Sequence, residues 1–305
     1  MQRVAVARNA MATRFEIVLV GENLSSLRAA GEEALDEIER LEARLSLYRP
    51  SSEIANINAR AAREPVRVEP ALFRLLQHAR QLSEETKGAF DITVAPLMRA
   101  WGLMGSKVGR DAPPSRSELA AARACVGMPL IELDPKSFTI RFSRPGVMLD
   151  LGAIGKGYAI DQAAELIREA GVAEALIHGG TSTVYAIGGP WKVAIDSDKE
   201  DPVAVVNLTD TALSVSAVWG KSFRIGDKTY GHVLDPRTGK PVSRALLAAV
   251  ILPSATETDA LSTALLTVGS RGHSQIQALR PEMRSVVLTQ THKLSSSGIP
   301  TSRYS

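Results

Sequence analysis

The sequence has a single cysteine, no membrane-length hydrophobic run and no marked excess of charge of one sign. One cysteine excludes an internal disulfide and a metal site built from cysteines. Cys125 lies at an expected helix end, so we expect a buried structural thiol. No secretion signal or lipobox cysteine is visible near the N-terminus. These absences favour a cytoplasmic location, and a periplasmic one stays open if the N-terminus has been trimmed.

The charge balance argues against a nucleic-acid partner. Thirty-six Lys and Arg residues face 33 Asp and Glu residues, giving a formal net charge of +3, and no basic run is present. The slight surplus suits an anionic small ligand, although many proteins with neutral partners share it. With 45% hydrophobic and 23% charged residues, the composition is that of a globular protein. A chain of 305 residues can bury a sizeable core as one large domain or two intimate ones.

Hydrophobic periodicity predicts a mixture of helices and strands. Amphipathic helices are expected at 24–45, 70–86 and 254–268, a further helix at 158–170, and a short helix or turn at 52–58. Strands are expected at 14–20, 147–151, 175–177, 192–195, 203–208, 223–225, 230–234, 247–252 and 285–289. Residues 105–117 are expected to form an exposed loop. Because strands and helices do not alternate regularly, an α+β fold is favoured over a doubly wound one.

The first candidate site is the glycine-rich segment from Asp150 to Tyr158. A strand, a glycine turn and a helix in succession would bring backbone N–H groups together where an anion could bind. The glycines are spaced by three and then two residues, which matches neither a dinucleotide fingerprint nor a Walker loop. The alternative is a tight strand–helix connection whose glycines only permit the turn.

The second candidate is the pair Asp259 and Thr263. They are four residues apart, so on a helix their oxygens share one face. A carboxylate and a hydroxyl are suitable partial ligands for Mg²⁺, which takes waters and substrate phosphates as its other ligands. The alternative is a capping role for the carboxylate near a helix N-terminus.

Two further segments carry polar side chains beside turns. The stretch Tyr230–Pro241 is a strand that runs into a polar turn and places His232 where it could act as a general base. A half-buried histidine with a structural hydrogen bond is the alternative. The stretch Gly88–Leu97 puts Asp91 and Thr93 around an expected strand start, and alone it could be a simple turn.

Taken together, these segments resemble the FAD:protein FMN transferase (ApbE) family. The matching segments occur in order along the chain: Met11–Thr13, Leu45–Asn58, Ala89–Asp91, Asp150–Tyr158, His232–Pro241 and the helix with Asp259 and Thr263. The resemblance implies one domain over residues 1–305, with an FAD- and Mg-binding core at about 11–269. It also implies a T-fold-like α+β unit of two lobes with a flavin cleft between them.

The resemblance also implies roles for individual residues. FAD would be contacted by Met11, Tyr48, Ala89, Phe90, Asp91, Asp150 and Lys156. Mg²⁺ would be held by the backbone carbonyl of Ala153 and the side chains of Asp259 and Thr263. His232, with Asp259 as its rival, would take the proton from the acceptor hydroxyl. Tyr48 would offer a stacking surface for adenine.

The implied reaction moves the FMN half of FAD to a threonine or serine hydroxyl of an acceptor flavoprotein, with release of AMP. Two alternatives stay open: Mg-dependent hydrolysis of FAD to FMN and AMP, and FAD binding or storage without catalysis. The sequence departs from the family pattern at Thr181, Ala217 and Gly231, where an acidic residue, a glycine and a histidine are usual.

Overall fold

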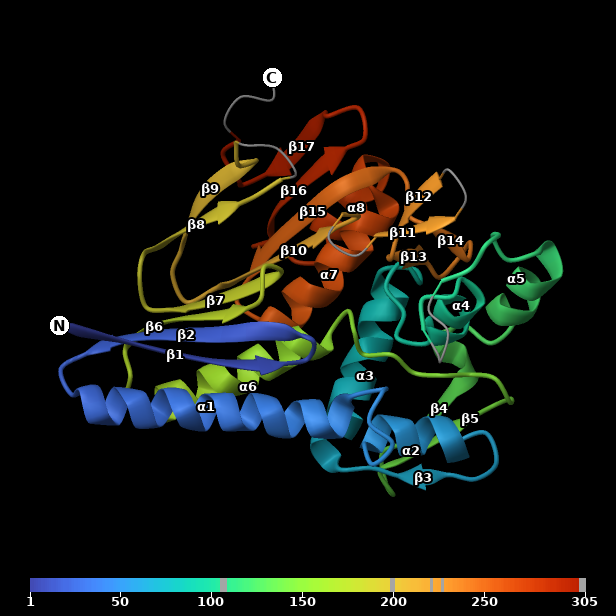
Figure 1. Ribbon diagram of the computed structural model, residues 1–305, viewed down its shortest axis with the longest axis horizontal. Helices are drawn as coiled ribbons and strands as arrows, with labels where there is room; N and C mark the ends of the chain where they lie inside the picture. Colours follow the sequence, from blue (N-terminus) through green and yellow to red (C-terminus); the bar gives the residue numbers. More distant parts are fainter. Residues whose placement is uncertain (105–108, 198–200, 220–221, 226–227, 302–305) are drawn as a thin grey trace.

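An eight-stranded antiparallel sheet forms the centre of the molecule (Figure 1). The computed structural model describes residues 1–104, 109–197, 201–219, 222–225 and 228–301. In order across the sheet, the strands are β1 (Gln2–Ala10), β2 (Thr13–Gly21), β6 (Glu174–Gly179), β7 (Thr183–Ile187), β10 (Ala212–Ala217), β15 (Ala245–Leu252), β16 (Arg284–Thr289) and β17 (Leu294–Ser297).

Both faces of this sheet are covered. The helices α1 (Leu24–Leu45), α6 (Gly155–Glu169) and α7 (Ala255–Val268) pack on one face, and the hairpin of β8 (Trp191–Ile195) and β9 (Ala204–Leu208) packs on the other. Strand β15 shows how burial on both faces affects the sequence of a strand. Ala248 and Val250 belong to the core under the helices, whereas Leu247 and Ile251 belong to the core under the hairpin. A strand buried on both faces therefore has an unbroken apolar sequence.

A second lobe lies beside the α7 end of the sheet (Figure 1). It contains α2 (Glu53–Arg60), α3 (Pro70–Glu85), α4 (Ala95–Ala100), α5 (Arg116–Arg123) and a small sheet of β3 (Val66–Arg67), β5 (Thr139–Phe142) and β4 (Ile131–Asp134). Two hairpins lie next to it, β11 (Ser222–Ile225) with β12 (Lys228–Gly231) and β13 (Leu234–Asp235) with β14 (Lys240–Pro241). Trp101 docks the second hairpin by donating its indole N–H to the carbonyl of Gly239 at 2.7 Å.

The remaining elements are short. They are α8 (His273–Gln277) and the 3₁₀ turns Met128–Leu130 and Ser270–Gly272. Within the described ranges, none of the helices combines the length and apolar character that a membrane crossing requires. The prediction of an α+β fold is confirmed.

Several predicted boundaries need correction. The segment 147–151 is not a strand, because its backbone bonds partners outside the sheets. Asp150 N donates to Ile92 O at 2.7 Å, and the amide of Asn58 bonds both the N–H and the carbonyl of Leu149, at 2.7 and 3.0 Å. The helix predicted from residue 158 begins three residues earlier, at Gly155. The predicted strand 230–234 is interrupted between β12 and β13.

Two predictions in the second lobe have mixed outcomes. Cys125 does follow a helix, α5, but it is only partly buried, with its Sγ 3.6 Å from the carbonyl of Pro145. Residues 105–108 of the predicted loop lie outside the described residues, and α5 begins at Arg116 within that loop. The stretch around Asp91 forms turns between α3 and α4 and starts no strand.

Candidate functional site

The helices α6 and α7 approach each other closely at Gly157. A Cβ atom on this residue would lie 2.1 Å from the carbonyl oxygen of Ala255 and 2.9 Å from the Cβ of Asp259. The contact lets Asp259 Oδ2 accept a hydrogen bond from Gly157 N at 3.1 Å, across 102 residues of sequence. The glycine-rich segment and the helix expected to bind the cation therefore meet.

Gly157→Ala is expected to destabilise the protein by about 3 kcal/mol, because the added methyl group would overlap a backbone oxygen that cannot rotate away. Urea unfolding measures the difference. Gly155→Ala is the matched control, since its Cβ would meet Leu151 Cβ at an ordinary 3.6 Å and should change stability by less than about 1 kcal/mol. Equal stabilities of the two variants would contradict the tight contact.

The carboxylate of Asp259 is buried at this contact and faces the ammonium group of Lys156. Its side chain belongs to a residue only 4% exposed, and Lys156 Nζ lies 3.8 Å from Oδ1. Lys156 Nζ also donates to the carbonyl of Gly152 at 3.3 Å. Capping of α7 does not explain Asp259, because Ser254 is the N-cap and accepts from Glu257 N at 3.2 Å.

Thr263 lies one turn after Asp259, and its hydroxyl contacts a residue of the central sheet. Its hydroxyl donates to Asp259 O at 3.2 Å and contacts Ser216 Oγ of β10 at the same distance. Ser216 also contacts Ser262 Oγ at 2.9 Å. The threonine oxygen thus has a fixed place beside the buried carboxylate.

These residues fit a hard divalent cation. The donor set offers the Asp259 carboxylate, the Thr263 hydroxyl and, next to Ala153, the carbonyl of Gly152 that Lys156 contacts, all of them oxygens. Over the described ranges, no three His, Cys, Asp or Glu side chains cluster as a metal site. Such a set leaves coordination positions for phosphates and waters, as Mg²⁺ prefers.

The glycine-rich segment does not form the open cradle of N–H groups that the sequence indicated. Gly152 N donates to Asp150 Oδ1 and Gly155 N to Leu151 O, both at 2.7 Å, and Gly157 N is taken by Asp259. The glycines therefore serve the turn and the helix contact. Within this segment, the positively charged side chain of Lys156 is the group suited to binding a phosphate.

Tyr48 and the Ala89–Asp91 stretch, two of the segments expected to contact FAD, meet around Asp150. Tyr48 is 69% exposed, and partial burial of its hydroxyl together with the charge of Asp150 raises its pKa. Asp150 N is bonded to Ile92 O, which follows the Ala89–Asp91 stretch directly. The structure therefore brings Tyr48, this stretch and the start of the glycine-rich segment together.

Ala89 and Phe90 are each 1% exposed, so any ligand contact there would come from their backbone. The carboxylate of Asp91 is also buried and accepts from Thr93 N at 2.8 Å and Met128 N at 3.2 Å. Burial raises the pKa of Asp91, although these hydrogen bonds oppose the shift. Asp91 thus ties the chain after α3 to the segment before β4.

Met11 lies in a strained turn. Met11 and Ala12 connect β1 to β2 with φ angles of 50° and 58°, a left-handed conformation that costs non-glycine residues about 1–2 kcal/mol each. The turn packs against Gly180, where a Cβ would lie 2.1 Å from Thr13 Oγ1. Strain of this kind is kept when the surrounding structure fixes it, often at a ligand site.

His232 directly follows β12 and is partly buried. Its neighbour Gly231 packs tightly against the end of β10, because a Cβ there would lie 3.0 Å from Val218 O. Val218 comes two residues after Ser216, which contacts Thr263. The segment with Gly231 and His232 therefore packs against the end of β10 that also contacts Thr263, the expected cation ligand.

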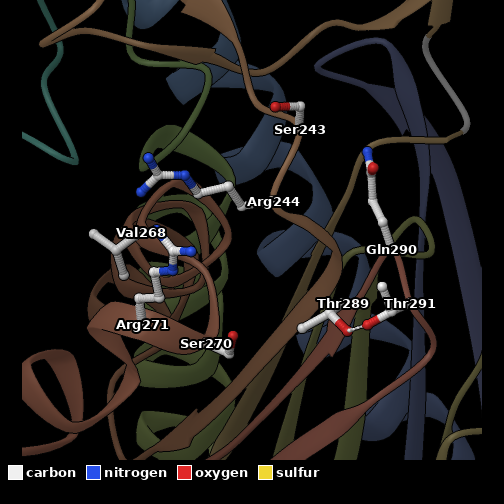
Figure 2. Close-up of a pocket in the computed structure, with 8 residues that line it drawn as sticks. All are labelled: Ser243, Arg244, Val268, Ser270, Arg271, Thr289, Gln290 and Thr291. Carbon is white, nitrogen blue, oxygen red and sulfur yellow. Dashed lines mark hydrogen bonds between the residues drawn. The ribbon is translucent and has the colours of Figure 1, made fainter.

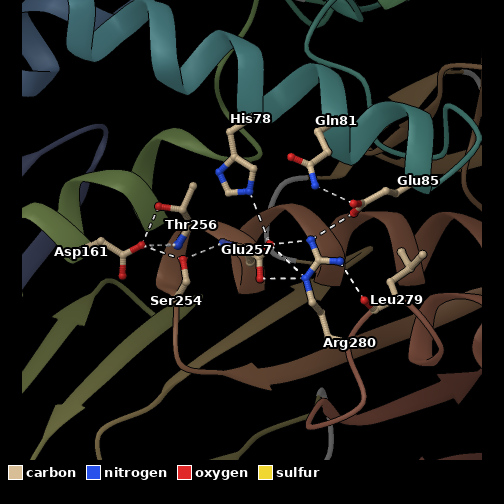
Figure 3. A network of polar contacts seen from close by, with 9 residues as sticks. All are labelled: His78, Gln81, Glu85, Asp161, Ser254, Thr256, Glu257, Leu279 and Arg280. Atoms are coloured by element: carbon tan, nitrogen blue, oxygen red, sulfur yellow. Dashed lines mark hydrogen bonds and ion pairs between the residues drawn. The ribbon is translucent and has the colours of Figure 1, made fainter.

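Sequence reasoning missed the residues that fix α7 in place. Asp161 of α6 accepts hydrogen bonds from Ser254 Oγ at 2.9 Å, Ala255 N at 2.8 Å and Thr256 N at 2.9 Å (Figure 3). This carboxylate binds the N-terminus of α7 and holds it against α6. Nothing in the sequence around Asp161 indicates these partners, which lie more than ninety residues away.

A second group of charges links α7 to α3. Glu257 accepts from Arg280 Nη2 at 2.6 Å and lies 3.4 Å from His78 Nε2, and Arg280 also bonds Glu85 at 3.0 Å (Figure 3). Burial alone would raise the pKa of Glu257, but the hydrogen bonds from His78 and Arg280 lower it to about 2.

Acid is expected to break this network. Because the folded-state pKa of Glu257 is depressed, its contribution is present above an unfolded pKa of 4.5 and is lost as the pH falls towards about 2. The shift corresponds to about 3 kcal/mol. Urea unfolding from pH 6 to pH 3 should show a steeper loss for the wild type than for Glu257→Gln. Parallel curves would contradict the assignment.

The comparisons with known proteins agree with this geometry. A profile described as the ApbE family matches residues 11–287.

The chain belongs to the ApbE family.

Among curated relatives, a protein of Klebsiella pneumoniae named FAD:protein FMN transferase is 30% identical over 279 residues, which are 87% of this chain and 79% of the relative. The protein of Escherichia coli K12 with the same name is 32% identical over 74% of this chain and 67% of its own length.

Solved structures show the same fold. The crystal structure of the ApbE protein from Thermotoga maritima superposes with a TM-score of 0.89 at 25% identity, covering 97% of each chain. The flavin transferase ApbE from Vibrio cholerae gives a TM-score of 0.86 at 24% identity over 97% of each chain. The family resemblance and the fold inferred from the sequence are both confirmed.

Proposed function

We propose that this protein transfers the FMN moiety of FAD to a serine or threonine hydroxyl of an acceptor flavoprotein, forming a phosphoester and releasing AMP, with Mg²⁺ as cofactor. The observation that carries the proposal is the meeting of Lys156, Asp259 and Thr263 where α6 and α7 touch. The names of the ApbE relatives support the transfer of FMN from FAD.

The arrangement suits chemistry at a pyrophosphate. Asp259, Thr263 and the Ala153 carbonyl would hold Mg²⁺, which neutralises charge on phosphate oxygens when bound. Lys156 adds a positive charge beside this position, 3.8 Å from Asp259. Exposed Tyr48 near Asp150 would stack on the adenine. FAD would then lie with its adenosine end towards Asp150 and its phosphates towards α7.

The transfer is an in-line substitution at the FMN-side phosphorus. The acceptor hydroxyl oxygen forms a bond to this phosphorus, and the bond from phosphorus to the bridging oxygen breaks. AMP leaves with that oxygen. His232, which follows β12, takes the hydroxyl proton. Met11 and the Ala89–Asp91 stretch would help to hold the nucleotide.

Mass spectrometry tests the proposal directly. Purified protein, FAD and Mg²⁺ are incubated with a fragment of a flavoprotein that carries a serine or threonine flavinylation site. We expect the fragment to gain one FMN per modified hydroxyl and AMP to appear in equal amount. A parallel incubation without the fragment measures hydrolysis. FMN and AMP formed at the same rate without acceptor would favour a hydrolase, and unchanged FAD would favour a storage protein.

A further inference from the structure

A pocket of about 270 Å³ lies at the C-terminal end of α7, beyond the residues assigned to FAD and the cation (Figure 2). Three stretches distant in sequence form it: the chain after β14, the end of α7 with the turn that follows, and the turn after β16. Arg244 and Arg271 extend around Val268 from two of these stretches (Figure 2).

The chemistry of the pocket suits an anion. Its other polar groups include the hydroxyls of Ser243 and Ser270, and none of the described residues that line it carries a carboxylate. Both Arg244 and Arg271 are exposed, and neither has a hydrogen bond or ion pair within the part of the chain that the structure describes. Guanidinium groups bind carboxylates through charge-assisted hydrogen bonds.

The neighbouring arginine Arg280 shows the contrast. It lies in the same part of the chain but is held between Glu257 at 2.6 Å and Glu85 at 3.0 Å. Its charge is therefore used inside the fold. The charges of Arg244 and Arg271 remain available for a group from outside the described chain.

Ordered backbone turns hold the walls of the pocket. Gly269 ends α7 with a φ of 65° and donates its N–H to Leu265 O at 2.9 Å. Arg244 lies against this cap, with its Cβ 3.2 Å from the point where a Cβ of Gly269 would be. On the opposite wall, Thr289 Oγ1 accepts from Lys293 N at 3.1 Å. The bases of the pocket side chains are thus fixed before a ligand arrives.

Compensation of the helix dipole does not account for both arginines. The C-terminal end of a helix carries about half of a negative charge, and one nearby cation offsets it. Arg244 and Arg271 bring two full positive charges to the end of α7. The pocket therefore keeps a net positive charge, which favours an anionic ligand.

The position of the pocket indicates which ligand it takes. Along α7, Asp259 contacts α6, Thr263 follows, and Val268 lies roughly 7.5 Å beyond Thr263. The pocket is therefore farther along the helix from Lys156, where the phosphates of FAD would bind. Its second wall continues from Val242, whose N–H donates to Val233 O at 2.9 Å beside the expected base.

We propose that Arg244 and Arg271 bind the carboxylates of an acidic segment of the acceptor protein and thereby hold the acceptor hydroxyl beside the site. This inference rests on the proposed function, because it names the second substrate of that reaction. The ligand class follows from the charge of the pocket and from its place beyond Thr263 along α7.

The test measures peptide binding by the full chain. A fluorescein-labelled hexa-aspartate peptide is titrated with wild-type protein, and hexa-asparagine is the uncharged control. The double variant Arg244→Gln, Arg271→Gln should bind the acidic peptide at least about tenfold more weakly and with less dependence on salt. Arg141→Gln is the matched control, because Arg141 is an exposed arginine on β5, away from the pocket.

A kinetic measurement then separates the docking site from the chemistry. With an acceptor fragment as substrate, the double variant should raise the KM for the fragment about tenfold and leave the KM for FAD unchanged. Unchanged peptide binding by the double variant would overturn the inference. Displacement of the labelled peptide by AMP or inorganic phosphate at lower concentration than by unlabelled peptide would assign the pocket to a phosphate instead. Absence of any FMN transfer by the wild type would contradict the proposed function, while the titration would still decide the pocket.

Discussion

Asp259→Asn is expected to lower the rate of FMN transfer by at least about 10³-fold while the protein stays folded. Asparagine keeps an oxygen that can accept the hydrogen bond from Gly157 N, so the contact between α6 and α7 survives. The substitution removes the buried negative charge that lies 3.8 Å from Lys156. A divalent cation would thereby lose its anionic protein ligand. Mass spectrometry gives the transfer rate, and calorimetry gives the Mg²⁺ affinity without any turnover.

The neighbouring threonines provide the control for this prediction. Thr263→Val should weaken Mg²⁺ binding, because it removes an expected ligand oxygen. Thr267→Val removes a hydroxyl one turn later that donates to Thr263 O at 2.8 Å, and it should leave Mg²⁺ affinity unchanged. If Asp259→Asn binds Mg²⁺ as tightly as the wild type, the carboxylate serves only the N-terminus of α6.

Amphipathic helices could be predicted well because their apolar residues recur at helical spacing in the sequence. Leu24–Leu45 was predicted to the residue, with Leu27, Leu35, Ile38 and Leu41 on the buried face. Asn23 caps this helix by accepting hydrogen bonds from Ser25 N and Ser26 N. Local propensity, periodicity and the cap all agree in this segment.

Strands were predicted less completely, for a physical reason. β1, β7 and β10 were missed although all three pair within the main sheet. β10 begins with buried Ala212 and Leu213 and continues with Ser214 and Ser216, whose hydroxyls bond across to α7. Serines with such partners resemble a polar loop in sequence. Only the partner strand and helix show that the segment belongs to the core.

The site could be predicted through the family resemblance but not from periodicity. Asp259 and Thr263 share a helical face as their spacing requires. Their meeting with Gly157 depends on a close helix contact that no local pattern encodes. The same holds for Asp161, whose bonds to the N-terminus of α7 join segments more than ninety residues apart.

His232 and Asp259 compete for the role of general base, and the structure gives them different surroundings. Asp259 is 4% exposed and already faces Lys156 and Gly157 N, so its oxygens are engaged. A carboxylate that also holds a divalent cation is a weak base. His232 comes from a separate segment that directly follows β12, and a neutral imidazole can accept a proton.

His232→Asn is therefore expected to lower the transfer rate by about 10²–10⁴-fold while the affinity for FAD stays nearly constant. The acid limb of the pH–rate profile, which reports protonation of the base, should disappear in the same variant. Added imidazole should restore part of the rate to His232→Ala, because the small base can enter the space that the side chain leaves. Equilibrium binding of FAD, measured by the quenching of its fluorescence, separates a loss of chemistry from a loss of substrate. Transfer by His232→Asn at close to the wild-type rate would instead assign proton removal to Asp259 or to a metal-bound water, with His232 only shaping the end of β10.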